Sequence, residues 1–378
     1  MARWSRSFCL VMMGALLAAC SATKDPRRTP VPLVDFKPVL EVKQAWTASV
    51  GKSKGYLFEP IAVAGAIYAA GANGTVAKFD VTTGQTIWHN KLDADLSAGV
   101  GSDGTTSAVG ALDGTVYALG SDGKMLWKAD AGGEVLAPPL VGQGFVLVRT
   151  IDGRISAFDS TTGERKWEFR ARQMPLNLRT TTGMTFAGSG AILAGFPGGS
   201  LAAINLQTGD AYWQTPVSFP QGVTEVERLN DVTGAPTLVG RTTCAVTFQG
   251  RIGCFSVESG QPLWQQPFSS YGGLAQDEQT VVSANDYSNI ALYDVATGNK
   301  IWQNDRLKSR DVSAPLLLGR AIVVGDYQGY VHFLSRETGD FIARMKTDGS
   351  AIVAPPVVAG QTLVVLTRDG ELYAFQPQ

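Results

Sequence analysis

Histidine and cysteine are scarce in this sequence. Its 378 residues include 2 histidines, His89 and His332, and 4 cysteines. The histidines stand far apart, and neither belongs to a pair spaced like the ligands of a zinc site. Aspartates are more numerous, but Asp113, Asp152 and Asp369 each precede a glycine, where turn chemistry accounts for them. The sequence therefore offers no pattern typical of a metalloenzyme or of general acid–base catalysis.

Charged residues are also few, at 17% of the chain, and their signs are balanced. There are 32 lysines and arginines against 33 aspartates and glutamates. No segment gathers enough basic side chains to neutralise a run of phosphates, which argues against nucleic acid as a partner.

The apolar run at the amino terminus is too short to span a bilayer. Arg3 and Arg6 precede it, and it covers residues 8–19, as in a signal peptide. It ends in Leu-Ala-Ala-Cys at Cys20, which resembles the lipobox of bacterial lipoproteins, where small residues admit the peptidase and the cysteine sulfur receives a diacylglyceryl group. We predict a signal peptide over residues 1–19 and lipidation of Cys20. An ordinary secretory signal with an incidental cysteine is the alternative.

Residues 20–42 are expected to form a flexible tether. Prolines at positions 26, 30, 32 and 38 and several charges favour an extended chain there. Ser21, and not aspartate, follows the cysteine. In enterobacterial lipoproteins that difference separates outer-membrane from inner-membrane proteins. The resemblance therefore implies a lipid anchor at the periplasmic face of the outer membrane.

Glycine and a regularly spaced tryptophan are what the sequence has in abundance. The 43 glycines cluster in short turn-like segments between runs rich in valine, isoleucine, threonine and aromatic residues, which is an all-β composition. No stretch after the signal peptide shows the apolar spacing of an amphipathic helix. Seven of the 8 tryptophans recur 38 to 51 residues apart, at Trp46, Trp88, Trp127, Trp167, Trp213, Trp264 and Trp302.

The segment before each tryptophan after the first repeats one arrangement. Asn73-Gly74 is followed by a strand-like run, then by Thr83-Gly84 and by Trp88. We expect both residues of Asn-Gly and Asp-Gly pairs to supply the positive φ angles of tight hairpins, and the Thr-Gly pairs to do the same. A period near 42 residues with two hairpin signals fits four-stranded propeller blades. A seventh copy keeps Thr338-Gly339 but is expected to replace its tryptophan with Arg344.

The two ends of the chain predict how the ring closes. The eighth copy stops after Phe375, before its second turn, whereas Trp46 precedes the first complete copy. Residues 44–50 should therefore supply the missing outer strand of the last blade. We predict an all-β fold over residues 43–378, an eight-bladed β-propeller of four-stranded antiparallel blades. Prolines that suit the edge position of an innermost strand precede or begin several blades, at Pro60, Pro139, Pro236, Pro315 and Pro356.

The repeat resembles known propellers. The motif from Ala157-Phe158-Asp159 through Thr162-Gly163 to Trp167 resembles the tryptophan-docking repeat of pyrroloquinoline-quinone (PQQ) dehydrogenases. The same repeat behind a lipobox resembles the BamB family of lipoproteins, part of the β-barrel assembly machinery (the Bam complex) of the outer membrane. The resemblance covers nearly the whole chain. It implies a non-enzymatic scaffold without a cofactor, which binds a POTRA domain of BamA and supports folding and insertion of outer-membrane proteins.

Two segments carry the closer likeness, residues 175–179 and 225–232. Within them, Leu176, Leu178, Arg179 and Asp231 match the positions by which the family is thought to hold BamA. From the residues alone, two leucines on one side of an extended segment beside an arginine suit an interface. Internal packing, with Arg179 paired to Asp231 or Glu227, accounts for them as well.

Two other functions remain open at this point. A PQQ-like quinoprotein, or another small-molecule-binding periplasmic propeller, is the first alternative. A quinoprotein would need a calcium site and, in many members, two adjacent cysteines, and this sequence has no such pair. The second is a structural lipoprotein that binds peptidoglycan or unfolded barrel strands through exposed blade edges.

Cys244 and Cys254 flank the Gln249-Gly250 turn symmetrically. Opposed positions of a hairpin bring β-carbons close enough for a disulfide, which an oxidising periplasm would favour. Two buried free thiols are the alternative.

Overall fold

The computed structural model describes residues 29–378. The expected signal peptide, residues 1–19, and Cys20 lie outside this part of the chain. Within it every regular element is a β-strand, in agreement with the all-β composition. None of these described residues forms a helix of the length and apolarity needed to cross a membrane.

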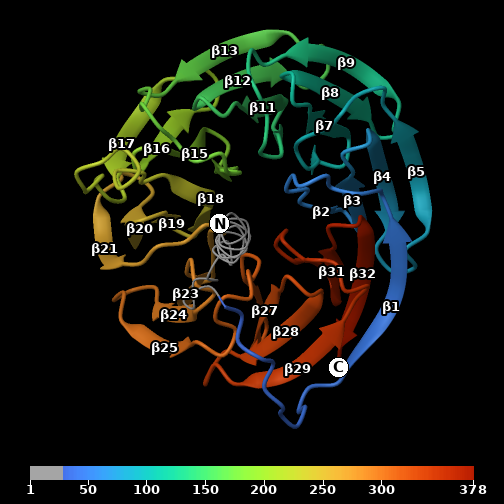
Figure 1. The fold of residues 1–378 in the computed structure, drawn as a ribbon. Coiled ribbons are helices and arrows are strands. Elements are labelled where there is room, and N and C mark those ends of the chain that lie inside the picture. Colours follow the sequence, from blue (N-terminus) through green and yellow to red (C-terminus); the bar gives the residue numbers. More distant parts are fainter. Residues whose placement is uncertain (1–28) are drawn as a thin grey trace, which may run out of the picture.

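The strands form eight four-stranded antiparallel sheets arranged in a ring, as predicted (Figure 1). Blade 1 consists of β2 (Ile61–Val63), β3 (Ala66–Ala70), β4 (Thr75–Asp80) and β5 (Thr86–Lys91), and blade 2 of β6 (Gly101–Ser102), β7 (Thr106–Gly110), β8 (Thr115–Gly120) and β9 (Met125–Asp130). Blade 3 consists of β10 (Leu140–Gly142), β11 (Phe145–Arg149), β12 (Arg154–Asp159) and β13 (Arg165–Arg170), and blade 4 of β14 (Met184–Ala187), β15 (Ala191–Phe196), β16 (Ser200–Asn205) and β17 (Ala211–Pro216). Blade 5 consists of β18 (Val232–Val239), β19 (Thr242–Thr247), β20 (Arg251–Ser256) and β21 (Pro262–Pro267), and blade 6 of β22 (Leu274–Gln276), β23 (Thr280–Ala284), β24 (Ile290–Asp294) and β25 (Lys300–Asn304). Blade 7 consists of β26 (Leu316–Leu318), β27 (Ala321–Gly325), β28 (Tyr330–Ser335) and β29 (Phe341–Lys346).

The eighth blade joins the two ends of the chain, as predicted. Its strands are β30 (Val357–Ala359), β31 (Thr362–Leu366), β32 (Glu371–Pro377) and the amino-terminal β1 (Val42–Ser49). β1 pairs antiparallel with β32, from Val42 opposite Pro377 to Ser49 opposite Glu371. Figure 1 shows the two strands side by side at the outer edge of the ring.

The antiparallel order gives the ring two unlike faces. Connections between blades and the turns between the second and third strands of each blade lie on one side, which we call the connection face. Turns between the first and second strands, and between the third and fourth, lie on the other side, the turn face. Within the described residues, only the connection face carries long segments, over residues 50–60, 171–183, 217–231 and 305–315.

The hairpin turns differ in detail from the expected ones. Gly74 and Gly114 have φ angles of 89° and 91°, but Asn73 and Asp113 do not enter the left-handed region. Their side chains instead accept hydrogen bonds from the backbone two residues later, as when the Thr75 N–H donates to Asn73 Oδ1 at 3.1 Å. In these two turns glycine alone takes the left-handed conformation, whereas Gln249 and Ser288 take it in the corresponding turns of blades 5 and 6.

Tryptophans of the outer strands lock seven of the eight blades to the next one. The indole of Trp264 lies over Gly298 of the following blade and donates from Nε1 to the Val295 carbonyl at 2.7 Å. A Cβ on Gly298 would lie 2.5 Å from that indole. The Thr-Gly glycine is thus required twice, for its φ of 71° and for the space above it. The same indole–glycine contact joins Trp46 to Gly84, Trp88 to Gly123, Trp127 to Gly163, Trp167 to Gly209, Trp213 to Gly260 and Trp302 to Gly339. Each of these indoles except that of Trp88 also donates from Nε1 to a backbone carbonyl of the next blade.

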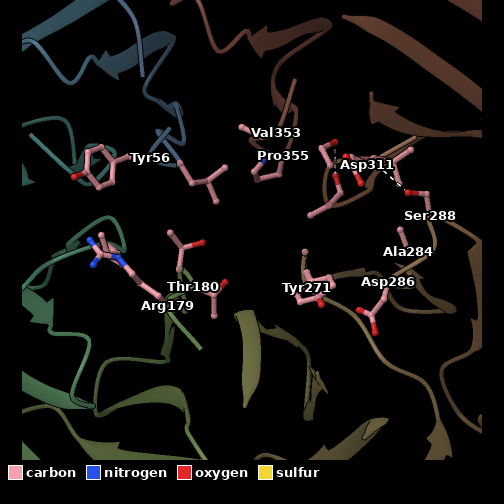
Figure 2. A pocket seen from close by; sticks show the side chains of 18 of the residues that line it. Tyr56, Arg179, Thr180, Tyr271, Ala284, Asp286, Ser288, Asp311, Val353 and Pro355 are labelled. Carbon is pink, nitrogen blue, oxygen red and sulfur yellow. Dashed lines mark hydrogen bonds between the residues drawn. The ribbon is translucent and has the colours of Figure 1, made fainter. Parts of the chain in front are cut away.

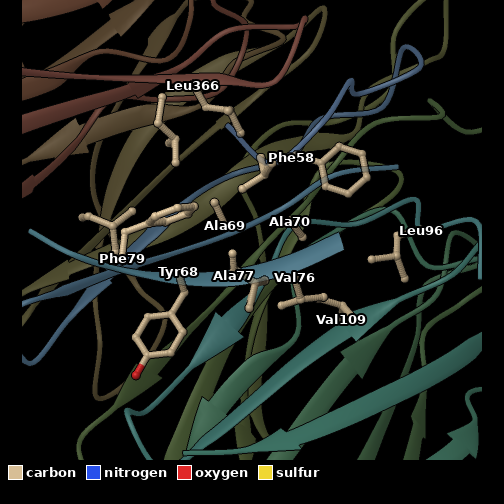
Figure 3. Close-up of a cluster of buried hydrophobic side chains, with 14 of the residues drawn as sticks. Phe58, Tyr68, Ala69, Ala70, Val76, Ala77, Phe79, Leu96, Val109 and Leu366 are labelled. Carbon is tan, nitrogen blue, oxygen red and sulfur yellow. The ribbon is translucent and has the colours of Figure 1, made fainter. Parts of the chain in front are cut away.

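The core lies between blades and is built from the second and third strands. Figure 3 shows the cluster around blade 1, which includes Tyr68, Phe79 and Leu96, each at most 2% exposed. All five residues of β3, β7, β11, β23, β27 and β31 are buried. Outer strands such as β5 and β17, in contrast, carry exposed side chains along their length.

Two expectations about the chain ends are corrected. Ala343, not Arg344, occupies the tryptophan position of blade 7: it lies opposite Phe333, as Trp302 lies opposite Leu292 in blade 6. The tether expected over residues 20–42 is not free throughout, because residues 31–40 pack against blade 7. There the backbone N–H groups of Val39 and Leu40 donate to the Ile342 carbonyl.

Candidate functional site

The predicted contact residues lie on the connection face. Leu176, Leu178 and Arg179 belong to the connection from β13 to β14, and Asp231 ends the connection from β17 to β18. These connections leave neighbouring blades, so the structure brings the two predicted segments together. The four residues do not, however, form one continuous surface.

Asp231 is buried and positions the loop; this corrects its expected place on the surface. The residue is 3% exposed. Its carboxylate accepts hydrogen bonds from the backbone N–H of Leu178 at 2.5 Å and of Gly198 at 3.1 Å. Burial raises the pKa of Asp231, while these two bonds and the charge of Arg149 act in the opposite direction. Asp231 thus ties residues 175–180, which we call the contact loop, to blade 4.

Arg149 supports the same tie from below. Its guanidinium is buried and donates to the carbonyls of Gly195 and Thr182. Burial lowers the pKa of Arg149 to about 10, and the charge of Asp231 partly offsets that effect. A buried cation and a buried anion therefore stand beneath the contact loop, each limiting the cost of the other's burial.

The exposed part of the contact loop consists of Pro175, Leu176 and Arg179. Leu176 is 43% exposed, and Leu178 is partly buried beneath the loop. The Arg179 side chain is 58% exposed and forms an ion pair with Glu134, from the connection between β9 and β10. Neither Asp231 nor Glu227, the partners considered from the sequence, pairs with Arg179 in the structure.

The connection from β17 to β18 adds exposed apolar side chains to this face. Phe219, Val223 and Val226 are 68%, 88% and 60% exposed. A turn that resembles a helix N-cap holds the segment: Glu227 Oε2 accepts from the N–H of Val223 and of Thr224, and the Glu227 N–H donates to Thr224 Oγ1. The backbone bonds from Thr224 and Val223 lower the pKa of Glu227. Its carboxylate orders the turn that exposes the two valines.

A cavity of about 530 Å³ opens at the centre of the connection face. Figure 2 shows its lining side chains around an open centre, with Arg179 and Thr180 on one side and Asp286 and Tyr271 on another. They come from the connections and turns of several blades, so the cavity is the mouth of the central channel. The contact loop therefore forms part of its rim.

The residues do not fit a quinone–metal centre. Among residues 29–378 there is no group of three or more histidine, cysteine, aspartate or glutamate side chains that could hold a metal ion. His89 is exposed on β5, and His332 is buried in β28, in a different blade. The calcium site that a PQQ dehydrogenase needs has no counterpart in this part of the chain.

Cys244 and Cys254 stand opposite each other in β19 and β20 of blade 5 and are joined by a disulfide. Both are fully buried and pack against Trp264 in the core between blades 5 and 6. The bond lies within a blade and away from the connection face.

Three residues of the site were not identified from the sequence: Glu134, Arg149 and Gly198, whose N–H donates to Asp231. Glu134 and Arg179 are 45 positions apart, and no local pattern marks them as a pair. Arg149 carried a detectable signal, since it is a charged residue within the otherwise apolar run of β11. Such a charge in a core strand indicates a buried partner.

Sequence comparisons identify the family to which the chain belongs. The sequence family described as "Outer membrane protein assembly factor BamB" matches residues 72–304 and 288–378. The protein of that name from Burkholderia pseudomallei is 65% identical over 363 residues, covering 96% of this chain and 95% of the relative. Another of the same name, from Bordetella pertussis, is 44% identical, with coverage of 96% and 95%.

Solved structures show the same architecture. The crystal structure of BamB from Moraxella catarrhalis superposes with a TM-score of 0.82 at 24% identity and covers 89% of this chain and 100% of that one. The quinohemoprotein alcohol dehydrogenase from Comamonas testosteroni gives a TM-score of 0.71 at 15% identity, covering 92% and 78%. At these identities the likeness shows the fold alone, which enzymes and assembly factors share. The extensive identity to proteins named BamB decides between them: this chain belongs to the BamB family of outer membrane protein assembly factors.

Proposed function

We propose that this protein is a scaffold in outer-membrane protein assembly and that its connection face binds a POTRA domain of BamA. The observation that carries the proposal is the contact loop, which a buried carboxylate holds in place while Leu176 and Arg179 face solvent. Preorganised loops of this kind lose little conformational entropy on binding. The names of the relatives support the assembly role.

The chemistry of the surface fits a protein partner better than a small molecule. Leu176, Phe219, Val223 and Val226 are apolar and exposed on one face, and Arg179 supplies a planar donor beside them. Apolar anchors with an arginine are typical of interface centres. The Arg179 side chain is 58% exposed and that of Glu134 is 18% exposed, so solvent screens the arginine end of this ion pair, and Arg179 can exchange this partner for one on another protein.

Replacing Arg179 with alanine should weaken BamA capture and leave unfolding nearly unchanged. Truncation of an interface arginine costs about 2 kcal/mol, or roughly thirtyfold in affinity, whereas loss of an exposed ion pair costs less than about 1 kcal/mol. Binding of purified BamA periplasmic domains and thermal unfolding, measured on the same preparation, check both halves of this expectation.

Arg241→Ala is the matched control for that experiment. Arg241 is also exposed and paired with one carboxylate, that of Glu258, but it lies in the turn between β18 and β19, on the turn face. Its loss should leave binding unaltered. Undiminished capture by a combined Leu176→Ala, Arg179→Ala variant would reject the contact loop as the binding site.

We further propose that Cys20 anchors the protein by a lipid to the periplasmic face of the outer membrane. The motif ending at Cys20 and the following Ser21 support this proposal. A Cys20→Ala variant should remain an unlipidated precursor and leave the outer-membrane fraction, because it has no site for the acyl chains. Wild-type maturation and fractionation of the variant would contradict the anchor.

A further inference from the structure

One junction of the ring has no tryptophan lock. Blade 7 carries Ala343 at the tryptophan position. Blade 8 also lacks the turn on which an indole would rest, because its two outer strands, β32 and β1, are the two ends of the chain. The junction between blades 7 and 8 therefore needs a different closure.

Residues 31–40 cross the outside of this region from one face to the other. At the connection face the Val31 N–H donates to the Lys308 carbonyl at 3.1 Å. Near the turn face the N–H groups of Val39 and Leu40 donate to the Ile342 carbonyl at 3.0 and 3.1 Å. β1 begins two residues later, so this segment leads directly into the closing strand.

Apolar contacts fix the segment along its length. The Phe36 ring stacks on Phe341, with ring centroids 5.5 Å apart. Leu33 and Val34 pack with Phe36 against the core between blades 6 and 7, and Leu40 packs against the core between blades 7 and 8. The segment thus contacts the cores on both sides of blade 7.

Two arginines hold the backbone of the segment. Arg310 Nη1 donates to the Val31 carbonyl, and Arg344 Nη2 donates to the Val34 carbonyl, both at 3.1 Å. The Arg344 guanidinium also lies over the Phe36 ring, 5.0 Å from its centroid. These carbonyls are three residues apart, so the hold is distributed along the backbone.

Buried acceptors in blade 7 fix both arginines. Asp326 is fully buried and accepts from Arg310 Nε at 2.9 Å and Nη2 at 2.7 Å. His332, also fully buried, has Nε2 at 3.0 Å from the Asp326 carboxylate, and its Nδ1 accepts from Arg344 Nε at 3.2 Å. Since Nδ1 is the acceptor, His332 is neutral and donates from Nε2 to Asp326.

We propose that residues 31–40 form a strap that closes the junction between blades 7 and 8 in place of a tryptophan, and that Arg310 and Arg344 are the clasp that keeps β1 in the ring. The strap goes beyond the proposed binding of BamA, because none of its contacts lies on the contact loop. Its first residue leaves the propeller on the connection face. A force applied to the chain before residue 31 therefore acts on the contacts of Arg310 and Arg344 before it acts on β1.

Hydrogen exchange of β1 tests the strap. In Phe36→Ala and in Arg344→Ala, amides of residues 42–49 should exchange about tenfold faster than in the wild type, as expected for the loss of one charge-assisted hydrogen bond or a ring contact. Amides of β9, whose blade keeps the Trp127 lock, should not change. Arg241→Ala, on the turn face, is the control for loss of an arginine.

Two results would overturn the proposal. Unchanged exchange of β1 in both variants would show that the strap does not retain the strand. Equal acceleration in β1 and β9 would show general destabilisation and no specific closure. The strap makes no contact with the contact loop, so both variants should still capture BamA. Measuring BamA capture therefore distinguishes failure of the strap proposal from failure of the proposed binding site.

The clasp should loosen in acid, because a protonated His332 cannot accept from Arg344. The charged and titratable groups around it are Asp326, Arg310, Arg344 and Tyr330, with Asp35 near Arg344 on the strap. Burial lowers the pKa of His332, and Asp326 opposes that shift. The unfolded chain therefore binds the proton more readily, and stability is lost as pH falls below about 6.5 toward the lowered pKa.

The His332→Gln variant distinguishes protonation of His332 from other effects of acid on the exchange of β1. The amide of His332→Gln can donate to Asp326 and accept from Arg344, but it does not titrate. After correction for intrinsic rates, β1 of the wild type should exchange faster at pH 5 than at pH 7.5, and β1 of His332→Gln should not. If the variant showed the same acid response as the wild type, the histidine would have no part in the clasp.

Discussion

Replacing Asp231 with alanine is expected to abolish BamA capture and also to lower the free energy of unfolding by about 3 kcal/mol. The substitution leaves the N–H groups of Leu178 and Gly198 without their acceptor, at a cost of about 1–3 kcal/mol for each buried donor. It also removes the anion nearest to the buried Arg149. The contact loop then loses its tie to blade 4. Denaturant unfolding and binding to BamA periplasmic domains measure the two effects.

The Asp231→Asn variant should have an intermediate effect. Asp231→Asn keeps one acceptor oxygen and loses the charge, so its stability and its BamA capture should lie between those of the wild type and of Asp231→Ala. Arg179→Ala, in contrast, should lose capture without losing stability. If Asp231→Ala captured BamA like the wild type despite lower stability, the position of the contact loop would be irrelevant to binding.

The blades could be predicted because each carries its own local signals. The turn glycines and the tryptophan recur at fixed distances within a copy, and antiparallel hairpins need no long-range information. The spacing from turn glycine to tryptophan is four residues, as from Gly84 to Trp88. Applied to Gly339, this spacing gives Ala343, and not Arg344, as the residue at the tryptophan position of blade 7.

The site could be predicted only in part, because its energetics depend on pairs that are distant in sequence. Leu176 and Arg179 are exposed on the connection face. The sequence does not reveal that Asp231 is buried, since that follows from its meeting Leu178 across 53 positions. A carboxylate that supports a loop and one that meets a partner look alike until the loop is folded.

The strap shows the same limit at the amino terminus. Prolines and charges in residues 20–42 predict an extended tether, and the described part of this range before β1, residues 29–41, forms neither helix nor strand. Whether such a segment is free or docked depends on what faces it, in this case Phe341, Arg310 and Arg344. Composition carries no information about that partner surface.

Replacing Gly298 with alanine is expected to be among the most destabilising small changes in the propeller. A non-glycine residue in the left-handed region costs about 1–2 kcal/mol, and Gly298 has a φ of 71°. The added Cβ would also lie 2.5 Å from the Trp264 indole, which must move away and stretch its bond to the Val295 carbonyl. Overpacking of this kind adds about 1–3 kcal/mol. We expect a total near 3 kcal/mol in denaturant unfolding.

Gly319→Ala separates backbone strain from the tryptophan lock. Gly319 has a φ of 56°, and no atom lies within 4 Å of the position of its Cβ, so its substitution should cost only about 1 kcal/mol. Trp264→Ala completes a double-mutant cycle with Gly298→Ala. If the glycine exists to receive the indole, the second substitution should cost less once the first is made, because the clash has already gone. Strictly additive losses, or equal losses for Gly298→Ala and Gly319→Ala, would show that the glycine serves the turn alone and that the indole is held by other contacts.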